Sequence, residues 1–274
     1  MSAEQSLSAC PPTASAPPGA EAAGGYAPKY LVLGPLELRR GGLPCTPTPL
    51  KHRALLALLL LHANRPVPVD ALVDGLWGGR PPRAAVATLQ MYVSALRRVL
   101  DPAHRLGGGD ARRHPVLRTS GAGYLMAVAP GELDLDLFRT RAALGRELLA
   151  GGDCAAAGAA FRSALALWRG LPLGDLGRAC LPPHYAGRLT EERLAVLYER
   201  IGADLCAGRA GEVAGELREL CARYPSYEGF PRQLLSVPAG TGHRTEVLPG
   251  GPHPAPPGHE RCREARIRRT APPG

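Results

Sequence analysis

The residues with the clearest use in molecular recognition share one face of the segment between Pro82 and Leu100. That face is small, polar and basic, and its main members are Thr88, Gln90, Met91, Ser94, Arg97 and Arg98. Small residues permit close approach, amides and hydroxyls bond base edges, and guanidinium groups bind guanine or phosphate. This chemistry suits the reading of a nucleic-acid groove. For the helix alone, a plain solvated face explains the pattern equally well.

An apolar stripe on the other side of this segment would hold it against a core. Large apolar residues fall at steps of three and four, which is one stripe of an α-helix: Val86, Leu89, Val93, Leu96 and Leu100. We therefore expect a long helix here, buried along these five positions.

Two further helices are expected before it. Val69 to Trp77 is a short helical pattern, and the Gly- and Pro-rich residues 78–82 join it to the long helix, which predicts a helix-turn-helix. Lys51 to Ala63 is so rich in leucine that it should lie deep in the core. Lys51 stands at the start of this helix, where a positive charge opposes the helix dipole. Phosphate contact explains its position, and coincidence explains it as well.

A hairpin is expected behind the long helix. Residues 116–119 and 124–128 are strand-like and flank the turn residues 120–123. Behind a recognition helix such a hairpin is a wing, and Arg118 and Thr119 would then meet the phosphate backbone or the minor groove. A hairpin that only closes the core is the alternative.

The remaining elements complete a mainly α fold with a small β part. Residues 30–38 and 45–49 are extended and predict a small antiparallel sheet at the front of the first domain. The later helical patterns suggest a tetratricopeptide-like stack, and they cover residues 133–149, 155–168, 183–206, 212–224 and 227–235. Residues 1–25 and 236–274 have few large apolar groups, and we expect both to be disordered.

Charge is distributed unevenly over the 274 residues, a length that suits about two domains. Residues 26–131 carry 14 Lys and Arg against 5 Asp and Glu, a balance of +9, whereas residues 132–236 carry 13 against 14, a balance of −1. A basic first domain before a neutral second one suggests that the first binds a polyanion. A basic surface that serves solubility alone is the alternative.

Other classes of protein find little support. None of the seven cysteines forms a Cys-x-x-Cys pair, no zinc spacing is present, and we expect reduced packing cysteines in a cytosolic protein. No secretory signal, membrane-length apolar run or phosphate-binding loop is found. The hypothesis of an enzyme has poor support, because it rests only on the closeness in sequence of Cys180 and His184.

Four short motifs in the first domain follow one another at characteristic separations. They are Leu33-Gly34-Pro35-Leu36, Leu76-Trp77-Gly78-x-x-Pro81-Pro82, Leu89-Gln90-x-Tyr92-Val93-Ser94-x-Leu96-Arg97-Arg98 and Gly121-x-Gly123-Tyr124-Leu125. Together they resemble the OmpR-type winged helix of the SARP family of actinobacterial antibiotic regulators. Relatives commonly have Arg where this chain has Ala95, which implies that one DNA contact is missing. We expect no receiver domain before the winged helix, and so no phosphorylation control of the usual response-regulator kind.

The second domain resembles the bacterial transcriptional activation domain of the same family. The matching residues are Asp134-x-x-x-Phe138, Ala164-Leu165-x-Leu167-Trp168-Arg169-Gly170 and Ala207-Gly208-Arg209. The match stops near Leu235, so we expect domains at 26–131 and 132–235, the second one truncated relative to the family.

The resemblance implies a cytoplasmic, nucleoid-associated activator of antibiotic biosynthesis genes. It would bind direct repeats near promoters as a homodimer and would recruit RNA polymerase or its sigma factor through Trp77, Gly79 and Arg80. Thr88, Gln90, Met91 and Ser94 would face bases, while phosphates would be bound by Arg97, Arg98, Arg118 and Lys51. No catalytic residue, cofactor, metal or membrane partner is expected. A protein-interaction scaffold built on the helical domain is the alternative function.

Overall fold

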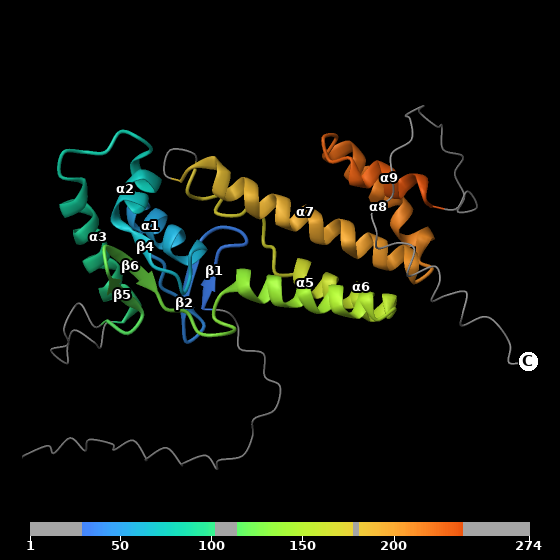
Figure 1. Ribbon diagram of the computed structural model, residues 1–274, viewed down its shortest axis with the longest axis horizontal. Helices are drawn as coiled ribbons and strands as arrows, with labels where there is room; N and C mark the ends of the chain where they lie inside the picture. The colour runs from blue at the N-terminus through green and yellow to red at the C-terminus, as the bar shows by residue number, and fades with distance from the viewer. Residues whose placement is uncertain (1–28, 102–113, 178–180, 238–274) are drawn as a thin grey trace, which may run out of the picture.

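The computed structural model describes residues 29–101, 114–177 and 181–237, with a winged-helix part followed by a helical part (Figure 1). The first sheet is antiparallel and has the order β1-β2-β3, with strands β1 (Tyr30–Leu31), β2 (Glu37–Arg40) and β3 (Leu43–Pro44). The second has the order β4-β6-β5, with strands β4 (Val67–Pro68), β5 (Leu117–Ser120) and β6 (Gly123–Met126). The expected wing is therefore the β5–β6 hairpin. The expected disordered ends, 1–25 and most of 236–274, lie outside the described residues.

Three helices lie between and beside these sheets, namely α1 (Leu50–Leu61), α2 (Val69–Trp77) and α3 (Ala85–Leu100). Helix α1 is the central one, because every residue from Ala54 to Leu60 is buried. A helix with apolar residues on all sides is stable only inside a core. Helices α2 and α3 both pack against it, and α3 lies toward the outer end of the molecule (Figure 1).

The buried stripe of α3 differs from the expectation at one position. Leu89, Val93, Leu96 and Leu100 are buried as predicted, but Val86 is 49% exposed and Ala85 is buried in its place. Because α3 begins at Ala85, steps of four from Leu89 lead back to Ala85 and not to Val86. Val86 therefore joins the outward face.

The helical part contains α5 (Asp134–Ala150), α6 (Cys154–Leu165), α7 (Pro183–Cys206), α8 (Ala210–Arg223) and α9 (Gly229–Leu235). Helices α5 and α6 form an antiparallel hairpin, and α7 runs along it toward the far end of the molecule (Figure 1). A second apolar cluster, centred on Ile201, Leu217 and Phe230, joins the end of α7 to α8 and α9.

The two parts share one continuous apolar core, and a buried carboxylate lies where they meet. Asp134, the first residue of α5, accepts hydrogen bonds from the backbone N–H groups of Val32, at 2.9 and 3.0 Å, and Leu33, at 3.0 Å. Burial raises the pKa of Asp134 to about 6, although these backbone N–H groups and the Arg169 guanidinium act in the opposite direction. Figure 1 shows the start of α5 beside β1.

Residues after α6 complete this junction. The backbone N–H of Arg169 donates to the Leu33 carbonyl oxygen at 2.8 Å, and its guanidinium donates to the Pro35 carbonyl oxygen at 2.9 Å. The backbone N–H of Leu36 donates to Oδ1 of Asp175 at 2.8 Å. The backbone of the loop between β1 and β2 is thus hydrogen-bonded to the helical part at several positions.

The expectation that all cysteines are reduced is wrong for one pair. Cys154 and Cys206 form a disulfide with their Cα atoms 5.8 Å apart. The two residues are separated by 52 positions, so no spacing rule could pair them, and the packing of α6 on α7 brings them together. Cys45 and Cys221 are free, while Cys10, Cys180 and Cys262 lie outside the described residues.

Candidate nucleic-acid interface

The outward face of α3 is formed by the predicted base-facing residues. Gln90, Ser94 and Arg98 are exposed, and Met91 is 63% exposed. Thr88 is half-buried, and its hydroxyl donates at 3.0 Å to the carbonyl oxygen of Ala84, the residue that precedes α3. The hydroxyl oxygen of Thr88 still has acceptor capacity, because it uses its hydrogen in this bond.

Two further exposed residues, one on this face and one just before the helix, were not predicted from the sequence. Val86 is exposed beside Gln90, one turn earlier on the helix, and Arg83 is exposed just before α3 begins. Val86 was missed because a large apolar residue near a helix start fits a buried stripe as easily as an exposed face. A positive residue such as Arg83 before a long basic helix is a signal that could have been used.

Arg97 is directed to the wing. Its Nε donates to the Leu117 carbonyl oxygen and its Nη2 to the Thr119 hydroxyl oxygen, both at 2.9 Å. The guanidinium carbon also lies 5.9 Å from the centre of the Tyr124 ring. These contacts join the last turns of α3 to β5 and β6, so Arg97 fixes the wing relative to the helix.

The wing carries the two predicted contact residues on its exposed surface. Arg118 and Thr119 are both exposed, and Arg118 Nε donates to the Pro115 carbonyl oxygen at 3.1 Å. The turn between the strands depends on Gly121, whose φ of 54° is in the left-handed region that favours glycine. Arg118 keeps further donors for a phosphate because a guanidinium has five.

The Lys51 side chain makes its contacts within the protein. Its ammonium donates to the Leu76 carbonyl oxygen at 2.5 Å, at the end of α2, and lies 5.9 Å from the Trp77 ring centre. A cation at a helix C-terminus is favourable, which accounts for a basic residue at the start of α1. Arg53, the next arginine of α1, pairs with Asp175 of the helical part. The structure therefore brings neither side chain to the face formed by Gln90 and Arg98.

An aromatic cluster ties α2 to α3 behind this face. Trp77 is half-buried and stacks on Tyr92, with ring centres 6.2 Å apart, and His52 meets Tyr92 edge-on at 4.8 Å. Burial first, and the nearby charge of Arg98 second, lower the pKa of His52 below its ordinary 6.5. His52 is therefore neutral at pH 7 and adds no charge to the interface.

The loop from α2 to α3 is exposed. Gly78 and Gly79 have φ values of 55° and 70°, so the loop reverses direction with two left-handed residues. Gly79 and Arg80 are exposed, whereas Trp77 is anchored in the aromatic cluster.

The described residues contain no group of three or more His, Cys, Asp or Glu side chains placed to hold a metal ion. Over the same ranges, no helix is long and apolar enough to cross a membrane. His184 lies against the Tyr185 ring, with ring centres 4.2 Å apart, and its proposed partner Cys180 is outside the described residues.

Two family models match the chain, one for each part of the fold. Residues 46–126 match the model described as "Transcriptional regulatory protein, C terminal", and residues 133–249 match "Bacterial transcriptional activator domain". A winged helix followed by this helical domain defines a transcriptional regulator.

The chain is similar in sequence to two regulatory proteins of Streptomyces. The regulatory protein DnrI of Streptomyces peucetius is 38% identical over 79% of this chain and 79% of its own length. The regulatory protein AfsR of Streptomyces coelicolor is 34% identical over 80% of this chain, which spans only 21% of AfsR. The chain belongs to the SARP family of transcriptional regulators.

A solved structure has the same fold. The structure described as "Mycobacterium tuberculosis EmbR in complex with low affinity phosphopeptide" superposes with a TM-score of 0.69 at 34% sequence identity. The superposition covers 77% of this chain and 54% of the EmbR chain, so about half of EmbR has its counterpart here.

Proposed function

We propose that this regulator is a sequence-specific DNA-binding activator of a secondary-metabolite biosynthesis cluster, acting in the cytoplasm on the nucleoid without enzymatic activity. The observation that carries the proposal is the outward face of α3. Gln90, Ser94 and Arg98 are exposed together on a helix that is anchored by a buried stripe on its other side. A helix of this kind fits a DNA major groove.

The proposed contacts divide by chemistry. Gln90 is the best candidate for bidentate bonding to adenine, and Met91 with the Thr88 methyl suits thymine methyl groups, while Ser94 bonds base edges. Arg98 and Arg118 are exposed cations on the helix and the wing and would bind phosphate. We retain Thr119 at the wing. We remove Arg97 and Lys51 from the direct contacts, because both are half-buried; Arg97 donates to the Leu117 carbonyl and the Thr119 hydroxyl, and Lys51 to the Leu76 carbonyl. Arg118 stays among the contacts, because it is exposed.

Membership of the family suggests how two copies of the protein would be arranged on DNA. We propose that two protomers bind direct repeats head to tail, so that the operator has two half-sites on the same face of the DNA double helix. Footprinting with the full chain on the neighbouring promoters tests this. Two protected stretches, offset by about one or two helical turns of roughly 10 base pairs each, are expected. Uniform weak protection would contradict binding at direct repeats, and no protection at low salt would favour the interaction scaffold as the function.

The exposed loop between α2 and α3 is the proposed polymerase contact. Arg80→Ala should leave promoter affinity unchanged and lower transcription in a purified polymerase assay, because the loop lies outside the base-facing surface. Arg65→Ala is the matched control, since Arg65 is another exposed arginine of the winged-helix part. Equal transcription from both variants and the wild type would exclude Arg80 from polymerase recruitment.

A further inference from the structure

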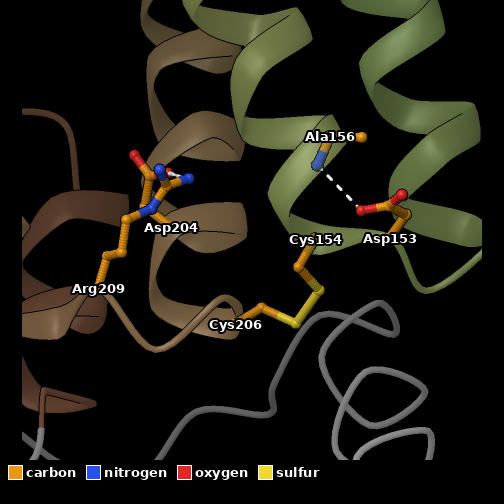
Figure 2. Close-up of a disulfide and its surroundings, with 6 residues drawn as sticks. All are labelled: Asp153, Cys154, Ala156, Asp204, Cys206 and Arg209. Atoms are coloured by element: carbon orange, nitrogen blue, oxygen red, sulfur yellow. Dashed lines mark hydrogen bonds and ion pairs between the residues drawn. A yellow bond between two sulfur atoms is a disulfide. The ribbon is translucent and has the colours of Figure 1, made fainter.

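The disulfide lies in the part of the molecule that DNA recognition does not use. Cys154 is the first residue of α6 and Cys206 is the last residue of α7, so the bond joins one end of each helix (Figure 2). This end of α7 is the one remote from the winged-helix part (Figure 1).

A buried polar cluster adjoins the disulfide. Asp204, near the end of α7, is only 3% exposed and pairs with three arginines, one of them on its own helix. Arg162 of α6 lies at 2.7 Å, Arg200 of α7 at 3.2 Å and Arg209, which precedes α8, at 2.5 Å. Figure 2 shows the Asp204–Arg209 pair beside the disulfide. The corner between α6, α7 and α8 is thus held by charge as well as by the covalent bond.

Close backbone packing holds the same corner without the sulfur atoms. A Cβ added to Gly158 of α6 would lie 2.8 Å from Oδ1 of Asp204, so α6 and α7 touch here. The Asp153 carboxylate caps α6 by accepting from the Ala156 N–H at 3.0 Å, which fixes the helix start that carries Cys154. Reduction of the disulfide should therefore leave the two thiols close together.

The two cysteines differ in accessibility. Cys154 is 9% exposed, whereas Cys206 is partly exposed, so Cys206 is the sulfur that a small thiol or disulfide reaches first. An accessible sulfur with a second cysteine held at bonding distance is the arrangement of a reversible dithiol–disulfide pair.

We propose that Cys154 and Cys206 form a reversible redox site whose co-reactant is a low-molecular-weight disulfide. The Cys206 thiolate attacks that disulfide, forms a mixed disulfide and releases one small thiol. The Cys154 thiolate then attacks the Cys206 sulfur and releases the second small thiol. Two protein thiols are oxidised and one small disulfide is reduced to two thiols, while reduction runs the same steps backward. The oxidised form fixes the α6–α7 corner.

Equilibration of the full chain in mixtures of reduced and oxidised glutathione tests the exchange. Alkylation followed by peptide mapping should show Cys154 and Cys206 passing together between the dithiol and the disulfide, with Cys221 remaining a thiol in the reducing mixtures. Cys154→Ser should instead leave Cys206 as a glutathione adduct in the oxidising mixtures. A folded wild type that keeps both residues as thiols in excess oxidised glutathione, or carries separate adducts on each, would overturn the proposal.

Thermal unfolding tests the consequence for the fold. The disulfide closes a loop of 52 residues, and its loss should lower Tm by roughly 5–10 °C in a domain of this size. Cys221→Ser should retain this redox-dependent shift, and Cys206→Ser should abolish it. An equal Tm for oxidised and reduced wild type would show that the pair does not fix the corner.

Discussion

The two adjacent arginines near the end of α3, Arg97 and Arg98, have different surroundings. Arg98 is exposed on the outward face, whereas Arg97 donates to the Leu117 carbonyl oxygen and the Thr119 hydroxyl oxygen. We infer that Arg98 binds phosphate and that Arg97 positions the wing. The two substitutions should then have different signatures in DNA binding.

Arg98→Ala should weaken binding to every duplex and lower the salt dependence of log Kd by about one unit, because one phosphate contact is lost. Fluorescence anisotropy across a salt series measures this slope. An unchanged slope would exclude Arg98 from the phosphate contacts.

Arg97→Ala should be coupled to Thr119→Val in a double-mutant cycle on DNA affinity, with an interaction energy of roughly 0.5–3 kcal/mol. The reason is that both substitutions remove the same bond between α3 and the wing. The pair Arg98→Ala and Thr119→Val is the control and should be additive. Additivity in both pairs would mean that the Arg97–Thr119 bond does not position the wing.

The sequence predicts which residue types face outward on α3 but not which of them are already occupied. Spacing places Arg97 near the outward face, yet its partners lie 20 and 22 residues away on the wing. Lys51 poses the same difficulty, because its acceptor belongs to the end of another helix. Side-chain partners depend on tertiary packing, which residue spacing does not encode.

Elements with clear periodicity were predicted well. The bounds of α2 and α7 agree with the helical patterns, and the wing falls where turn residues separate two short apolar runs. The short strand β3 and the exposure of Val86 were missed, because two-residue strands and helix starts contain too few residues for a period to show.

Gly145 of α5 illustrates how closely two elements meet. A Cβ at this position would lie 2.6 Å from the ring of Phe161, which is fully buried in α6. Gly145→Ala should lower the free energy of unfolding by about 1–3 kcal/mol through overpacking, less the helix propensity gained. Denaturant unfolding measures the difference.

Gly187→Ala in α7 is the matched control, since a Cβ there would meet no atom within 4 Å. It should raise the free energy of unfolding by roughly 0.5–1 kcal/mol, because alanine is the better helix former. A stabilised Gly145→Ala variant would show that the α5–α6 contact is looser than the distances indicate.

For the whole molecule, the junction explains why several separate motifs occur together. The loop Gly34–Pro35, the carboxylate of Asp134 and the Trp168–Arg169 segment all meet between the winged-helix and helical parts. The loop is separated in sequence from Asp134 and Arg169 by about 100 and 134 positions, so residue spacing could not show that these motifs meet. A fragment ending near residue 131 would lose Asp134 and Arg169, and DNA binding is best tested with the full chain.

Asp134 should make stability depend on pH in a defined direction. Its pKa is about 6 in the folded chain against an ordinary value of 3.8, so the folded state holds a proton between these pH values that the unfolded state has lost. The contribution of Asp134 to the free energy of unfolding is therefore greatest below about pH 4 and falls as pH rises through 6, by up to about 3 kcal/mol.

Denaturant unfolding of the wild type and Asp134→Asn between pH 4 and pH 7 isolates this contribution, because other carboxylates contribute equally to both proteins. The stability of the wild type relative to the variant should decline with rising pH. A difference that is constant over this range would contradict the raised pKa of Asp134.

The central claim is that the outward face of α3 reads DNA sequence, and Gln90 tests it most directly. The measurement is fluorescence anisotropy of the full chain, wild type and Gln90→Ala, with neighbouring-promoter and scrambled duplexes over a salt series. We predict that the wild type prefers one promoter with a steep salt dependence. Gln90→Ala should lose roughly 1–3 kcal/mol on that promoter alone. Equal affinity of the wild type for all duplexes, or an unchanged Gln90→Ala variant, would contradict the claim.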